Sequence, residues 1–400
     1  MHDERKNQPD SIPSKKGPII SLILCSRSDQ YQGDSRWRLQ TALNYVGRST
    51  QELGREEDVE VMVVDWGSQT PLRNLLKLNR EASRIVSFMH VPTEVARVEQ
   101  RESPFPEVIA LNAAARRARG EYIGRIDQDT LVGRHFLKTF FWLHERQRLL
   151  VPLRSALLLS NRRRVPYRVA VLSPHLSVVE RYVRWFGRFM PLMKPLPPHL
   201  FYQTFVGIWL LHRDVWFECG GYDEQFIHMD WQEVDMMLRL TPKYTLVNLG
   251  ELTDHDLYHL DHAHPLGAWE AARDRKCNPV RDLDNRPTEL YPNSENWGLN
   301  QYDLEILPPL IIDESNETRS VRQESKWLSF SAIVLFSGVQ IAADSLILAV
   351  RLLFVRPKAT YVTLKRRLHA AIETVSGQPI MRWPRLLTTR WSQRQFNQKV

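Results

Sequence analysis

The first third of the chain alternates between two kinds of hydrophobic spacing. Apolar residues at 108, 111, 115 and 118 recur every three or four positions, which predicts a helix that ends near Gly120. In the next segment, 121–126, apolar and polar residues alternate, which is typical of a strand. Helices and strands that alternate between residues 18 and 130 predict an α/β fold with a doubly wound, mostly parallel sheet.

The pattern is less regular beyond residue 130. Residues 134–205 are rich in arginine, proline and aromatic residues without a clean period, so we expect an irregular region with a basic loop at 162–164. Regular structure is expected again at 206–250. A loop-rich segment should follow to residue 300, where the main domain, 18–300, ends in a polar linker at 301–325.

The C-terminal segment, 326–400, has a different pattern. Residues 327–343 carry no charge, and Asp344 and Arg351 then interrupt an apolar stretch that reaches Val355. A helix that spans a bilayer needs about 20 apolar residues, and a central Asp would cost ~2.5–3.5 kcal/mol. We therefore interpret this segment as an apolar helix in the membrane interface with a basic tail. A helix packed on the body or on a second subunit is the alternative.

Composition narrows the class of protein. With 43% hydrophobic and 25% charged residues, wholesale disorder is not expected. The formal net charge is +8, but residues 356–400 carry ten Lys or Arg against one acid, so no nucleic-acid partner is expected for the body. The three isolated cysteines favour a reducing cytosol. The polar start, 1–17, lacks the apolar core of a secretory signal, and we interpret it as a disordered leader.

Two carboxylates flank Gln128 directly after the predicted strand. In an open parallel sheet, ligands bind outside the carboxyl ends of the strands. Asp127 and Asp129 therefore stand where hard oxygen ligands would suit Mg²⁺ or Mn²⁺ holding a diphosphate.

Five segments resemble, in the right order, the nucleotide-sugar glycosyltransferases of the GT-A fold, especially glycosyltransferase family 2 and its galactosyltransferase-like relatives. They are 19–27, 61–68, 112–129, 220–224 and 230–240. The resemblance implies a Rossmann-like GT-A catalytic domain over 18–300. It says little about which sugar is transferred.

On the donor side, the resemblance implies roles for Arg27, Asp65, Asn112, Arg125 and Asp127. Asp65 is expected to contact the nucleobase with Arg27 nearby, and Asp127 the ribose. An Asp65 that only caps the following turn is the alternative.

The resemblance also implies a set of metal ligands: Asp127, Asp129, His259 and His262. A histidine after the acceptor motif often completes the coordination in GT-A enzymes, and His259 is the first choice. The pattern at 255–259 is also similar to the H-E-x-x-H of zinc hydrolases. Asp in place of Glu disfavours that interpretation.

Glu233 is the candidate general base. It precedes apolar residues at helical spacing in a helix expected to end before Pro242, so it should lie on the buried face. The family usually has Glu-Asp at the positions where this chain has Gln232 and Glu233. Asp235 is a second catalytic candidate, with a structural role as its alternative.

Acceptor contacts are expected from Gly220, Gly221 and Trp231. The glycines would allow close approach of a sugar, and the indole would stack on it or pack in the core. The sequence thus predicts metal-dependent transfer from a nucleotide-sugar to a glycan or lipid-linked acceptor at the cytoplasmic face of a membrane. Inversion is the first choice, with retention as the alternative, because related folds do both. The alternative is a catalytically degenerate protein that binds sugar nucleotides or acts as a scaffold.

Overall fold

The computed structural model describes residues 17–29, 35–146, 153–165, 176–190, 192, 207–228, 231–262, 278–281, 287 and 289–313. Nearly all of the expected leader and the whole of 326–400 lie outside these residues, so the membrane-associating tail and the location of the chain stay predictions. Among the helices that are described, none combines the length and the apolar character needed to cross a bilayer.

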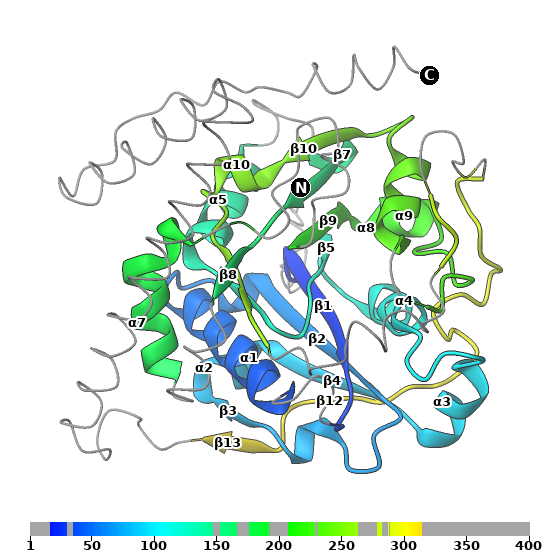
Figure 1. Cartoon of the computed structure of the whole chain (residues 1–400), viewed down its shortest axis with the longest axis horizontal. Coiled ribbons are helices and arrows are strands. Elements are labelled where there is room, and N and C mark those ends of the chain that lie inside the picture. Colours follow the sequence, from blue (N-terminus) through cyan, green and yellow to red (C-terminus); the bar gives the residue numbers. More distant parts are fainter. Residues whose placement is uncertain are drawn as a thin grey trace, which may run out of the picture.

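An eight-stranded sheet forms the centre of the fold (Figure 1). Its strand order is β10 (Thr245–Asn248), β7 (Ala156–Ser160), β9 (Ile208–His212), β5 (Tyr122–Arg125), β1 (Ile20–Ser26), β2 (Val59–Trp66), β4 (Val86–Val91) and β12 (Ile306–Leu307). The pairs β1–β2, β1–β5, β2–β4 and β7–β10 are parallel, whereas β9 and β12 run antiparallel to their neighbours. The predicted mostly parallel α/β sheet is confirmed.

Two small sheets complete the strand set of the described residues. They are β6 (Thr130–Val132), β11 (Leu257–Leu260) and β8 (Arg163–Val165), and β3 (Lys77–Asn79) with β13 (Ile311–Asp313).

Helices cover both faces of the central sheet. The helices of the described residues are α1 (Ser35–Gln51), α2 (Arg80–Ile85), α3 (Thr93–Glu99), α4 (Glu107–Arg117), α5 (Arg134–Glu145), α7 (Leu176–Phe186), α8 (Arg213–Glu218), α9 (Gln232–Leu240) and α10 (Leu249–Leu252), of which α7 packs on the small sheet that contains β8 and β11. Short 3₁₀ turns are η1 (Glu56–Asp58), η2 (Leu72–Asn74), η3 (Leu153–Ser155) and η4 (Gly187–Phe189). In the view of Figure 1, α1 and α5 lie at the left and α4 and α9 at the right.

The sheet is buried on both faces, which explains its continuous apolar strands. Leu22 and Leu24 of β1 join the core cluster that includes α1 and α5, while Ile23 and Cys25 join the cluster that includes α4 and α9. Alternate residues of one strand therefore reach opposite layers, as period-two geometry requires.

The central parallel strands end at the same edge of the sheet. Ser26 at the end of β1 pairs with Asp65 on β2, and β5 ends at Arg125 on the other side of β1. This register places the segments that follow these strands, including the D-x-D turn, next to one another.

Two predictions about the second half of the chain are wrong: the irregular region with a basic loop at 134–205, and the linker that begins at residue 301. The stretch 134–205 contains α5 and α7, and α5 buries Phe136, Phe140 and Leu143 at helical spacing. The expected basic loop at 162–164 instead contributes to β8, and Arg162 is buried. The expected linker begins with β12 and β13, which pair with β4 and β3, so the folded region extends to Asp313.

Gly120 follows the predicted helix but does not end it by adopting a left-handed conformation. The helix α4 ends at Arg117, and a Cβ on Gly120 would lie 2.5 Å from the backbone nitrogen of Ser21. This glycine lets the chain pass close to β1.

Gly47 has a similar role inside α1, and its replacement should destabilise the fold. A Cβ there would lie 2.4 Å from the backbone nitrogen of Ala82 in α2. Gly47→Ala should therefore lower the free energy of unfolding by about 1–3 kcal/mol, although Ala usually favours a helix over Gly. Denaturant titration would measure this. Gly17→Ala is the control, because its nearest neighbour would lie at 3.5 Å. A Gly47→Ala protein as stable as the parent would contradict the close packing of α1 and α2.

Candidate active site

The D-x-D turn connects β5 to β6 at the carboxyl end of the central strands. Gln128 faces the neighbouring strand, where its Oε1 accepts a hydrogen bond of 2.6 Å from the Ser26 hydroxyl. Thr130 donates its backbone N–H to the Asp127 carbonyl at 3.0 Å, which closes the turn. The two carboxylates therefore flank an anchored residue.

Asp127 is paired with two arginines. Its Oδ1 lies 2.6 Å from Arg125 Nη2, and its Oδ2 lies 2.6 Å from Arg162 Nη1. The side chain of Asp127 is still 25% exposed, compared with 7% for Asp129. Asp127 is thus the carboxylate of the pair that solvent reaches.

Asp129 is buried among three basic side chains. Its Oδ2 lies 2.7 Å from Arg38 Nη1, and its Oδ1 lies 2.9 Å from His259 Nδ1 and 3.5 Å from Arg162 Nη1. Burial by itself raises the pKa of Asp129, but His259 and the two arginines outweigh it and hold this pKa below its ordinary value. The carboxylate is therefore ionised throughout the neutral range.

His259 reaches Asp129 because β11 pairs with β6. The antiparallel register places His259 opposite Thr130, and the Leu260 N–H donates to the Asp129 carbonyl at 3.0 Å. The segment Leu257–Leu260 is a strand, so the two histidines of 255–259 do not share a helical face as in H-E-x-x-H zinc sites.

Asp129, His259 and His262 could hold a metal ion. One ligand atom from each lies within 4.8 Å of the other two. The 2.9 Å between Asp129 Oδ1 and His259 Nδ1 suits adjacent ligands of one ion, since bonds of about 2.1 Å at right angles place ligand atoms about 3 Å apart. The donor set of one carboxylate and two imidazoles differs from the all-oxygen set that Mg²⁺ prefers and suits a divalent transition-metal ion.

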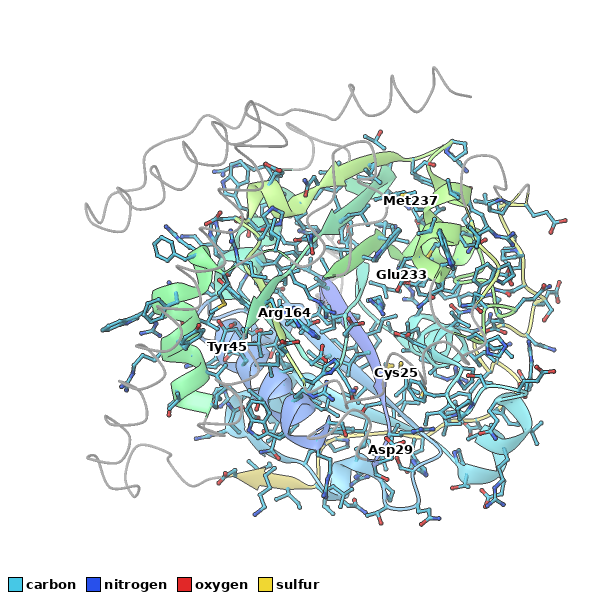
Figure 2. The ribbon with its side chains drawn as sticks, viewed as in Figure 1. Cys25, Asp29, Tyr45, Arg164, Glu233 and Met237 are labelled. Atoms are coloured by element: carbon cyan, nitrogen blue, oxygen red, sulfur yellow. The ribbon has the colours of Figure 1, made fainter. Side chains whose placement is uncertain are left out.

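Glu233 lies in the first turn of α9, on the side that faces the central strands (Figure 2). Its Oε1 is 3.2 Å from Arg125 Nη2, the nitrogen that also contacts Asp127. Burial raises the pKa of Glu233 to about 7, and Arg125 partly opposes this rise. A carboxyl with this pKa exchanges protons in the neutral range, as a general base must.

Glu107, the first residue of α4, is the third acid on Arg125. Its Oε1 lies 2.7 Å from Arg125 Nη2. Burial lowers the pKa of this guanidinium, but Asp127, Glu233 and Glu107 outweigh it and raise that pKa above its usual value. Arg125 is thus a permanent cation shared by three carboxylates.

Asp65 and Arg27 lie at the same edge of the sheet. Asp65 is 1% exposed, its Oδ2 accepts the Leu72 N–H at 2.7 Å, and His90 Nδ1 lies 3.3 Å from the same oxygen. The Asp65 carboxylate therefore bonds within the protein, to Leu72 and His90 and not to the turn residues directly after β2. The Arg27 guanidinium donates to the Pro104 carbonyl at 2.8 Å. Nucleobase contact by either residue stays a prediction.

Asn112, Gly220 and Gly221 are engaged with protein groups. Asn112 exchanges hydrogen bonds of 2.8 Å with the backbone N–H and carbonyl of Tyr222. Gly221 has a φ of +74°, and a Cβ there would lie 2.4 Å from Asn112 Oδ1. A Cβ on Gly220 would meet the Tyr291 ring. The physical reason for these glycines is therefore close packing within the protein, and the Asn112 amide ties α4 to this loop.

Asp235 and Trp231 also have structural surroundings. The carboxylate of Asp235 is 1% exposed and lies 2.9 Å from Arg239 and 2.8 Å from Arg281, so it is enclosed by two guanidiniums. These contacts are those of the structural alternative, and a catalytic role of Asp235 stays a prediction. Trp231 precedes α9 with a φ of +70°, is partly buried and packs against the core cluster below α4.

Sequence reasoning missed three charged residues of this site: Arg38, Glu107 and Arg162. Arg38 left a signal, because it falls on the apolar stripe of α1 with Leu39 and Ala42. Arg162 is the first of three consecutive arginines, which is the pattern of a solvated loop, and nothing local distinguishes it from its neighbours.

Comparisons with known proteins give structural neighbours at low similarity. No protein-family model matches the chain, and no curated protein matches it. A crystal structure of S. aureus TarS aligns with a TM-score of 0.33 and 15% identity over 64% of this chain and 38% of that one. A structure of S. aureus TarS 1–349 aligns with a TM-score of 0.33 and 14% identity over 57% of this chain and 58% of that one. The chain therefore spans less than two thirds of the length of either.

Proposed function

We propose that this chain transfers a sugar from a nucleotide-sugar donor to an acceptor hydroxyl, with inversion at the anomeric carbon. The observation that carries the proposal is the shared contact of Arg125 Nη2 with Asp127 at 2.6 Å and with Glu233 at 3.2 Å. An acid pair suited to a cation that holds a diphosphate and a carboxyl suited to proton removal are thus adjacent at the ligand-binding edge of the sheet.

Glu233 would act as the general base. Its carboxylate takes the proton of the acceptor hydroxyl while the hydroxyl oxygen bonds to the anomeric carbon. The bond from that carbon to the diphosphate oxygen breaks on the opposite face, and the nucleoside diphosphate leaves. Arg125 keeps Glu233 in place and neutralises the acids around it.

The donor side would be formed by the D-x-D turn. Asp127, which is partly exposed, would face the ribose, and Asp129, His259 and His262 would hold the cation. When bound, a divalent cation such as Mn²⁺ supplies several kcal/mol by stabilising the charge that develops on the leaving diphosphate. The acceptor would be a glycan or a lipid-linked glycan.

A donor screen tests the proposal directly. Thermal unfolding would be followed with a panel of nucleotide-sugars, with and without Mn²⁺, and the donor that stabilises the protein would then be tested for hydrolysis and transfer. A degenerate binding protein would be stabilised by a donor without converting it. A protein that no nucleotide-sugar stabilises would contradict the proposal.

Glu233→Gln should remove turnover and spare donor binding. The amide has the size of the carboxyl but cannot accept the hydroxyl proton, so kcat should fall by roughly 10²–10⁴-fold. Donor affinity, measured by calorimetry, should stay within a few-fold. Glu94→Gln on the exposed first turn of α3 is the control and should be fully active. Transfer by Glu233→Gln at the parent rate would refute the base assignment.

The pH dependence follows from the raised pKa of Glu233. The base works when deprotonated, so kcat/KM should fall tenfold per pH unit below about pH 7. Because the folded protein binds this proton more tightly than the unfolded chain, the contribution of Glu233 to stability should decrease as pH rises from about 4.5 to 7. Glu233→Gln should therefore be at least as stable as the parent at pH 8, which separates lost activity from unfolding. An acid limb that persists in the residual rate of Glu233→Gln would assign it to another group.

His262→Gln should weaken binding of Mn²⁺ by at least about tenfold. Asp129→Ala is a poorer test, because it leaves the buried Arg38 without its carboxylate, which typically costs about 3–5 kcal/mol. Mn²⁺ binding would be measured by electron paramagnetic resonance, with the exposed His135→Gln as control. Unchanged Mn²⁺ affinity in His262→Gln would remove this residue from the ligand set.

A further inference from the structure

Arg162 occupies the space between the two aspartates of the D-x-D turn. Its Nη1 lies 2.6 Å from Asp127 Oδ2 and 3.5 Å from Asp129 Oδ1, and it donates to the Thr130 hydroxyl at 2.7 Å. The side chain is 6% exposed. One nitrogen of the guanidinium therefore makes the contacts with both carboxylates.

The same guanidinium has further donors to offer. Its Nε is buried and makes no hydrogen bond to any of the residues that the structure describes. A buried donor without an acceptor costs free energy, and such groups are uncommon unless a ligand or water satisfies them. A planar guanidinium matches the oxygens of a phosphate in a bidentate manner.

The charges of the site are nearly balanced as the structure stands. Four acids, Glu107, Asp127, Asp129 and Glu233, lie among the guanidiniums of Arg38, Arg125 and Arg162. A dication that entered alone at Asp129 would add positive charge beside Arg162 in a poorly hydrated site, where charges repel strongly. A diphosphate that entered with it would compensate that charge and offer Arg162 new acceptors.

We propose that Arg162 exchanges partners during donor binding, a role that rests on the proposed function. In the metal-free protein its guanidinium bridges Asp127 and Asp129 and competes with a divalent cation. When the donor binds with the cation, the guanidinium leaves Asp129, where its contact is the longer one, and pairs with the diphosphate. Arg162 thus competes with the cation for the two aspartates and, once the donor is bound, contacts its diphosphate.

The test measures binding of Mn²⁺ and of inorganic pyrophosphate to the full chain, without turnover. The parent protein should bind Mn²⁺ weakly alone and more tightly with pyrophosphate. Arg162→Gln should bind Mn²⁺ alone at least about tenfold more tightly, because the competing cation is gone. It should bind pyrophosphate at least about tenfold more weakly, the effect of one charge-assisted hydrogen bond. A residue that only supports the site would lower both affinities when replaced.

The matched control is Arg55→Gln. Arg55 also bridges two carboxylates, Asp58 at 3.0 Å and Glu145 at 2.6 Å, away from the D-x-D turn. Both affinities should equal those of the parent. If Arg162→Gln does not fold, Arg162→Lys takes its place in the measurement. Its ammonium keeps the charge but cannot span both acids as a guanidinium does, so binding of Mn²⁺ alone should still tighten several-fold.

Unchanged or weaker Mn²⁺ binding in the folded Arg162 variants would overturn the exchange, and unchanged pyrophosphate binding would overturn the diphosphate contact. These outcomes are distinct from failure of the proposed function. A protein without transferase activity would still show the opposite changes in the two affinities, and an active transferase could lack them.

Discussion

The buried guanidinium of Arg125 connects the D-x-D turn to Glu233. Arg125 ends β5 and contacts acids from three other segments: Asp127 in the following turn, Glu107 at the start of α4 and Glu233 at the start of α9. Without a cation at this point, three acids in a poorly hydrated space would repel one another or take up protons. The pKa of Glu233, raised by burial yet limited to about 7, reflects this balance.

The position of Glu233 depends on a second group of contacts, in the segments around the start of α9. The Asn112 amide joins α4 to the loop after the Gly pair, and Arg239 donates to the carbonyls of Gly221 and Cys219 while paired with Asp235. These bonds fix where α9 begins, and Glu233 follows from that position. Asn112 and Asp235, which the sequence suggests as site residues, thus take part in contacts that determine the position of Glu233.

Local patterns were enough to predict the sheet, α4 and α9, because a strand buried on both faces and a helix with one apolar face each leave a short-range signature. The contacts between Asp129 and its partners leave no such signature. Arg38, Arg162 and His259 lie 91, 33 and 130 positions away. Their meeting depends on how β6, β8 and β11 pair and on how α1 packs against β6. His259 was reached by resemblance, whereas Arg162 had the local pattern of a surface loop. Burial of α5 was missed because its arginine and histidine residues obscured a regular phenylalanine spacing.

The contacts of Asp129 limit how many oxygens it can offer to a cation. Arg38 holds Oδ2 of Asp129 at 2.7 Å, so this carboxylate has one oxygen, Oδ1, to offer beside His259. A single oxygen with two imidazoles makes three protein ligands, which is the number in catalytic zinc sites, whereas structural zinc sites have four. The remaining positions would then be open to oxygens from outside the protein. The buried arginine that anchors Asp129 therefore also favours a cation that carries substrate over one that only stabilises the fold.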